Sequence, residues 1–192
     1  MTSAREQALA EIAFCENILA KGGLSVLSET FRDVSEIAAW DHYPPGDMFD
    51  PASNAQWFYH CHPAEEGSVE HGHFHCFVRP AGPQGPIHHL VAVGVDANGR
   101  LLRLFTVNQW VVGDDWLDAE ATIKLLGQFD MQMPRPSYLV NRWLTAIVVG
   151  YEEQIGGLIR ERDAALEAHR PEDGKPARRD RNLEVTSQLR FE

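Results

Sequence analysis

The hydrophobic positions of the first twenty or so residues recur with helical spacing. In residues 2–21 (TSAREQALAEIAFCENILAK) apolar side chains form one stripe behind a Thr/Ser cap, and Gly22 and Gly23 follow. This pattern predicts an amphipathic helix that ends at the glycines. A shorter helix or an irregular segment is expected over residues 28–40. Residues 40–51 (WDHYPPGDMFDP) contain two adjacent prolines, a glycine and an Asp-Pro pair, which predicts a loop without regular structure.

Two pairs of short apolar runs predict two β-hairpins. The first pair spans residues 56–79, where a polar segment with Pro and Gly separates two runs rich in aromatic residues. The second pair spans residues 88–110, and its strands flank the sequence DANG at residues 96–99, a strong turn signal. A connector rich in Pro and Gly, residues 80–86, joins the two hairpins.

Helical spacing returns in the C-terminal half of the chain. Acidic residues can cap a helix over residues 114–129, and the sequence MPRP that follows ends it. A long helix is expected over residues 137–170, with Gly156 and Gly157 marking a kink or a close helix contact. Residues 172–192 have linker-like composition and form a tail that is either flexible or an edge strand.

The order of these elements predicts an α+β fold. We expect one domain over residues 1–171, with an antiparallel sheet of four to five strands packed against N- and C-terminal helices. Helices that cover the apolar face of this sheet leave its other face open toward loops.

Composition narrows the possible partners and the compartment. The chain of 192 residues is 44% hydrophobic, which is ample for a core, and its net charge of −11 argues against nucleic acid or an anionic membrane as partner. Its three cysteines lack CxxC spacing, which favours reduced thiols. We see neither a signal peptide nor a spanning segment in the sequence. We therefore expect a cytoplasmic protein that acts on a small molecule.

Five of the nine histidines lie in the first hairpin, at every second position of its two runs. Successive side chains of a strand point to opposite faces, so the histidines of each run are expected to share a face. With antiparallel pairing, His60 would face His73, and Phe58 would face His75. The five imidazoles would then converge, with Cys61 and Cys76 on the opposite face. The cluster consists of His60, His62, His71, His73 and His75.

Converging neutral imidazoles are typical ligands of transition metals. The sequence therefore predicts a divalent metal ion, and iron, zinc, copper and nickel all remain possible. Alternate histidines on one strand cannot all bind one ion, so the expected set takes His60 and His62 with His73 and either neighbour of His73. The remaining histidine would orient a ligand or act as a general base. The alternative is an edge hairpin whose histidines face water or make ordinary hydrogen bonds.

Three further residues are candidates for catalysis. His42 lies in the 40–51 loop, which could fold over the open face and add a histidine or a carboxylate. Glu70 joins the site only if the turn of the first hairpin extends that far. Arg103 lies on the face alternate to its apolar neighbours and projects into water or into a polar pocket. Of the adjacent pair His88 and His89, at most one can join the site, because neighbours on a strand point to opposite faces.

Several motifs together resemble an uncharacterised bacterial family catalogued as a domain of unknown function. They lie between Trp40 and Leu166 and comprise HYPPGDMFDP, YHCHP, EHGHFHCF, RLFTVNQWVVGD, NRW and RERDAAL. The resemblance implies a shared fold and makes the histidine block a family feature, but it implies no reaction. The HxH at residues 60–62, followed by Glu65 and Glu66, is similar to cupin metal motifs. The glycine spacing of cupins is missing, however, and the helical content is too high for their barrel.

Three functions are compatible with the cluster. The first is a metal-dependent enzyme, a hydrolase or an oxidoreductase, in which three protein ligands leave a position for water or oxygen activation. The second is a metal or haem chaperone or sensor with a closed ligand set. The third is metal-free acid–base catalysis by histidine. A group of polar residues should converge on the metal in an enzyme and scatter in a chaperone: Tyr43, Arg103, Asn108, Asn141 and Arg142.

Overall fold

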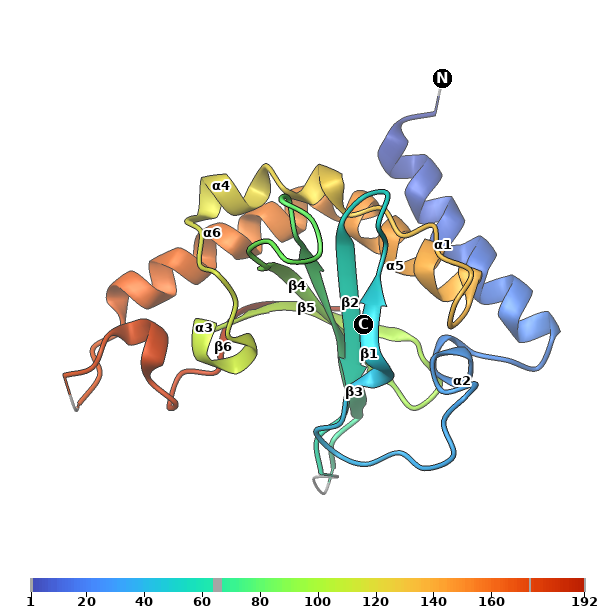
Figure 1. The fold of residues 1–192 in the computed structure, drawn as a ribbon, viewed down its shortest axis with the longest axis horizontal. Coiled ribbons are helices and arrows are strands. Elements are labelled where there is room, and N and C mark those ends of the chain that lie inside the picture. The colour runs from blue at the N-terminus through green and yellow to red at the C-terminus, as the bar shows by residue number, and fades with distance from the viewer. Residues whose placement is uncertain (1, 64–66, 173, 192) are drawn as a thin grey trace.

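A computed structural model describes residues 2–63, 67–172 and 174–191, and its helices and one antiparallel sheet confirm the predicted α+β class (Figure 1). The sheet has six strands, more than the four to five expected. The helices are α1 (Ala4–Lys21), α2 (Val26–Thr30), α3 (Gln109–Val112), α4 (Ala119–Ile123), α5 (Tyr138–Gly150) and α6 (Glu152–Ala168), with 3-10 turns η1 (Leu126–Gln128) and η2 (Ala177–Arg179). The strands are β1 (Tyr43–Phe49), β2 (Ala55–His60), β3 (Glu70–Val78), β4 (His88–Asp96), β5 (Leu101–Val107) and β6 (Val185–Arg190).

The strands lie in the sheet in chain order, β1 to β6, and each is antiparallel to its neighbour. Strands β1 to β5 form a meander, and β6 returns after the helices to pair with β5. Helices α1, α4, α5 and α6 lie on one side of this sheet (Figure 1). None of the helices in the described ranges is long and apolar enough to cross a membrane.

The expectation of an irregular loop over residues 40–51 was wrong, because Tyr43–Phe49 forms β1. The strand pairs Tyr43 with Tyr59 and then Met48 with Trp57, so extra residues bulge out between these pairs. Its prolines lack an N–H, but an edge strand bonds on one side only and tolerates them.

Two predicted helices are shorter than expected. Over residues 114–129 only α4 and a 3-10 turn form, because Asp114 and Asp115 accept backbone N–H groups at the start of β4 instead of capping a helix. The long C-terminal helix divides at Tyr151, not at the glycine pair 156–157, into α5 and α6. The close helix contact is at Gly150, where an added Cβ would lie 3.1 Å from Leu9 of α1.

The face of the sheet toward these helices forms the apolar core. Trp57 and Phe74 are fully buried there, and the Trp57 indole donates a hydrogen bond of 2.7 Å to the Asn141 side chain on α5. Cys76 shares this face and Cys61 belongs to the same core, away from the histidines as expected. The other face carries the alternate residues of the same strands.

Candidate metal centre

Three imidazoles converge at one end of the β2–β3 hairpin. His60 pairs with His73, as the sequence predicts, and His62 lies two residues beyond His60, the last residue of β2. Each offers one ligand nitrogen, and the three nitrogens lie within 4.8 Å of one another. The Nε2 atoms of His60 and His73 are 2.8 Å apart. Nitrogens around a tetrahedral zinc ion lie about 3.3 Å apart, so small ring rotations would let the three bind one ion.

Glu70 lies directly behind this group. Its carboxylate accepts a hydrogen bond of 3.0 Å from Nδ1 of His73 and two from Arg103, at 2.5 and 3.0 Å. Although burial opposes ionisation, the bonds from His73 and Arg103 lower the pKa of Glu70 to about 2. The ionised carboxylate can only accept, so Nδ1 of neutral His73 holds the hydrogen and Nε2 directs its lone pair toward His60. A carboxylate that holds a histidine in this way is typical of metal ligands.

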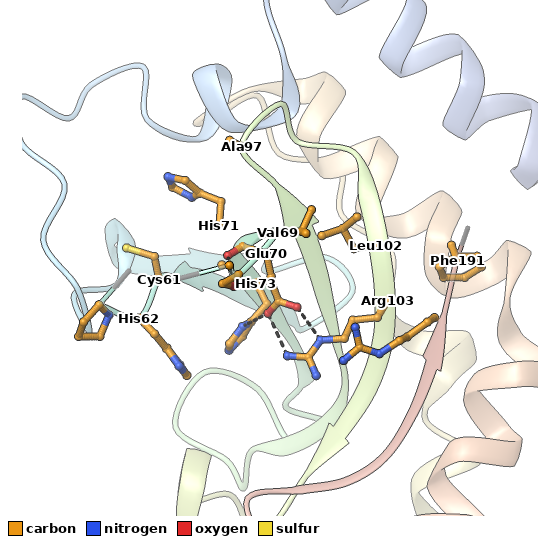
Figure 2. Close-up of a pocket in the computed structure, with 15 residues that line it drawn as sticks. Cys61, His62, Val69, Glu70, His71, His73, Ala97, Leu102, Arg103 and Phe191 are labelled. Carbon is orange, nitrogen blue, oxygen red and sulfur yellow. Dashed lines mark hydrogen bonds and ion pairs between the residues drawn. The ribbon is translucent and has the colours of Figure 1, made fainter. Parts of the chain in front are cut away.

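An irregularity in β3 brings Glu70 to this face and takes His71 away from it. Glu70 pairs with Asp96 while Gly72 pairs with Val95, so β3 has one extra residue at this point. A bulge of this kind redirects the side chains beside it. His71 therefore contacts Tyr59, whose hydroxyl lies 2.6 Å from its Nδ1, on the face opposite to His73. Figure 2 shows His71 pointing away from His62 and His73.

The absence of a side chain at Gly94 makes room for the Glu70 carboxylate. Gly94 lies between His73 on β3 and Arg103 on β5 in the sheet. An added Cβ would lie 2.7 Å from Glu70 Oε2 and 2.9 Å from Arg103 Cγ. Such contacts are too short for any other residue, so the arrangement requires glycine here.

Burial favours the neutral form of His60 and His73, and metal binding requires neutral imidazoles. Burial, followed by the neighbouring imidazoles, lowers the pKa of His60 to about 3. Burial also lowers the pKa of His73, although the Glu70 carboxylate opposes this shift. His62 is only partly buried and lies on the side where the group meets a cavity.

His75 forms a second, deeper contact with His89. The two rings are buried, and Nδ1 of His75 lies 3.0 Å from Nε2 of His89. Burial lowers the pKa of His75 well below its ordinary value and that of His89 to about 3. The other nitrogen of His75 is buried and has no hydrogen-bond partner among the residues that the structure describes. Of the pair 88–89, one histidine thus reaches the cluster, and His88 instead lies beside the backbone carbonyl of Asp115.

His42 lies at the margin of the cluster. Its ring stacks on Phe58 at 3.6 Å between centroids, lies 6.2 Å from the ring of His60, and its Nδ1 is 3.0 Å from Asp47. No pattern in the sequence singles out Trp40, yet its exposed indole stacks on His62, with 4.4 Å between the ring centroids. The backbone N–H of Trp40 donates a hydrogen bond to the backbone carbonyl of Cys61, which holds Trp40 beside His62. Glu65 and Glu66, the carboxylates of the cupin comparison, lie outside the described residues.

A cavity of about 890 Å³ is lined by two of the three converging histidines, His62 and His73. Its charged walls are Glu70, Arg103 and Arg190, and His62 and His73 reach it from the hairpin (Figure 2). A volume of this size is typical of small-molecule sites.

Of the five polar residues expected to converge in an enzyme, only Arg103 lies at the site. The other four have structural roles elsewhere. Tyr43 bonds the backbone of Ala38, Asn108 bonds carbonyls of residues 177 and 183, Asn141 bonds Trp57, and Arg142 pairs with Glu11 and Asp130. By this criterion, four of the five residues scatter, as expected for a chaperone, and only Arg103 lies where an enzyme would place it.

Comparison with known proteins identifies the family. The family model described as a domain of unknown function (DUF6969) matches residues 6–191, which confirms the resemblance drawn from the motifs and extends it to nearly the whole chain. No curated protein and no solved structure shows significant similarity to the chain.

Proposed function

The chain belongs to the family described as a domain of unknown function (DUF6969), and we propose that it is a metal-dependent enzyme acting on a small molecule. The observation that carries the proposal is the convergence of His60, His62 and His73 within 4.8 Å. A divalent ion of iron, zinc, copper or nickel fits this donor set. When bound with an open coordination position, such an ion supplies Lewis-acid chemistry and activates water or oxygen.

The surrounding residues support the assignment of these three ligands. Glu70 fixes the tautomer of His73, and Arg103 holds Glu70 in place, so both are positioning residues in this proposal. His75 is bonded to His89 and stands outside the three-ligand group. His42, held beside Asp47, is the candidate proton acceptor at the margin.

The cavity favours an enzyme over a closed metal carrier. Structural and storage sites surround the ion with protein ligands, whereas catalytic sites keep one position for water or substrate. Here two of the three histidines, His62 and His73, line a cavity large enough for a substrate.

Elemental mass spectrometry of protein purified without a histidine tag tests the metal. We expect about one equivalent of metal in the wild type and almost none in the His60→Ala/His73→Ala double variant, with folding of both checked by circular dichroism. His71→Ala is the matched control, because His71 lies on the same strand but faces away, and it should retain the metal. If the wild type binds no metal after reconstitution with iron, zinc, copper and nickel, the proposal is wrong.

Azide binding to the cobalt(II)-loaded protein tests the open position. We expect azide to change the visible absorption of cobalt, because an open position accepts the anion. A spectrum that azide leaves unchanged at saturating concentration would contradict an enzyme and favour a closed carrier or sensor.

A further inference from the structure

One row of residues crosses five strands of the sheet and begins at the candidate metal ligands. His60 on β2 pairs with His73 on β3, and His73 pairs with Gly94 on β4. Gly94 pairs with Arg103 on β5, and Arg103 pairs with Arg190 on β6. Directly paired residues point to the same face, so the row runs from two imidazoles to two guanidinium groups on one surface.

The two arginines at the far end of this row differ in their partners. Arg103 is half-buried, forms two bonds with the Glu70 carboxylate, and is neutralised by it. Arg190 is exposed, lines the same cavity, and has no ion pair among residues 2–63, 67–172 and 174–191. Glu70 is the only carboxylate among the described residues that line the cavity. The positive charge of Arg190 is therefore left to face the cavity.

The sign of this charge is opposite to that of the chain as a whole. The sequence carries a net charge of −11, and an acidic surface repels anions. Within the cavity, however, one arginine remains after Glu70 and Arg103 cancel, and a divalent ion on the histidines would add further positive charge. A local site of this kind selects an anionic ligand by charge and by the paired N–H donors of arginine, which match carboxylate and phosphate oxygens.

From this row we infer that the substrate is a small organic anion that lies across β3 to β6, with its acidic group on Arg190 and its other end at the histidines. The inference rests on the proposed metal site. His73 and Arg190 are three strand spacings apart, about 14 Å between Cα atoms, and the long arginine side chain can shorten the distance that the ligand must span. Leu102 also lines the cavity and offers apolar contact to such a molecule.

Calorimetric binding of anions to the metal-loaded protein tests the inference. The probes are succinate, glutarate and adipate, with inorganic phosphate and glycerol phosphate to separate carboxylate from phosphate recognition. Succinamide is the uncharged counterpart of succinate. The variants are Arg190→Gln, Arg190→Lys, and Arg5→Gln as a matched control, because Arg5 is an exposed arginine on α1 that does not line the cavity.

We expect at least one of these anions to bind the wild type. The Arg190→Gln substitution should lower the affinity for that anion about tenfold or more, because it removes a charge-assisted hydrogen bond. Arg190→Lys should lower this affinity less, because lysine keeps the positive charge. Arg5→Gln should leave the affinity unchanged. Succinamide should not bind, and added salt should weaken the anions.

The outcomes separate this inference from the metal proposal. If the protein binds metal but no anion of the panel binds, or if Arg190→Gln binds the anions as tightly as the wild type, the inference is wrong and the metal proposal stands. If elemental analysis finds no metal, the proposed function is wrong, whatever the anion measurements show. If Arg5→Gln and Arg190→Gln lowered the affinity for the anions equally, the inference would also be wrong. The loss would then come from the net charge of the protein and not from Arg190 in the cavity.

Discussion

The two faces of the central strands carry different chemistry, although their residues alternate along the same backbone. Toward the helices, Trp57 and Phe74 are fully buried and the one polar atom of Trp57 is satisfied by Asn141. On the opposite face, His73 and His75 are almost as deeply buried, yet one nitrogen of His75 has no hydrogen-bond partner within the described part of the chain. Burial of apolar surface stabilises a fold, whereas burial of a polar atom without a partner costs free energy. The face toward the helices therefore stabilises the protein, whereas the histidine face buries polar groups at a cost in free energy, which fits the proposed metal site.

The largest expected effect tests the stabilising face. Trp57→Ala removes a fully buried indole and leaves Asn141 without a donor, so we expect the free energy of unfolding to fall by about 3–5 kcal/mol. Urea denaturation of metal-free protein measures this change. Metal affinity of the remaining folded protein should be unchanged. A loss below about 1 kcal/mol would contradict the distinction between the two faces.

The second expected effect is a loss of folding stability at acid pH that arises from the buried histidines. Burial lowers the pKa of His89 to about 3 in the folded protein, whereas an unfolded histidine titrates near 6.5. Below pH 6.5 the unfolded chain gains a proton at this position that the folded chain does not bind until about pH 3, so stability falls as pH falls across this window. The loss from this one group is about 2.7 kcal/mol between pH 7.5 and pH 4.5.

His89→Gln isolates that contribution, because the amide keeps hydrogen-bonding capacity but does not titrate. Urea denaturation of metal-free protein at pH 7.5 and pH 4.5 should show a smaller loss of stability on acidification in the variant than in the wild type. Equal losses in the two proteins would mean that His89 is not responsible for acid sensitivity.

The smallest of these effects concerns the support of the metal ligands. Glu70→Gln removes the charge that holds Nδ1 of His73, and loss of such a carboxylate lowers metal affinity by about 10–100-fold. Competition with a chromogenic chelator measures the affinity. Glu120→Gln is the control, because Glu120 forms an exposed ion pair with Arg160, and it should bind metal as the wild type does. A Glu70→Gln variant with wild-type affinity would show that Glu70 does not act on the ligands.

The sequence predicted the regular parts of the fold well. The capping box of Ser3 and Glu6 begins α1 close to the expected residue, and the turn at residues 96–99 joins β4 and β5 as expected. Its errors fall where a partner distant in the chain decides the local structure. The prolines of β1 are tolerated because that strand lies at the edge of the sheet, and Asp114 is drawn to the start of β4.

By itself, the sequence determined which histidines share a face of the sheet. Alternation along β2 and β3 put His60, His73 and His75 on one face, because a strand repeats every two residues. The tertiary structure alone decided the rest. An extra residue in β3 exchanged His71 for Glu70, and strand pairing brought Arg103 and Arg190 into the row of the histidines. A bulge depends on the pairing of two strands and not on the pattern of either, so no periodicity in the sequence could reveal it.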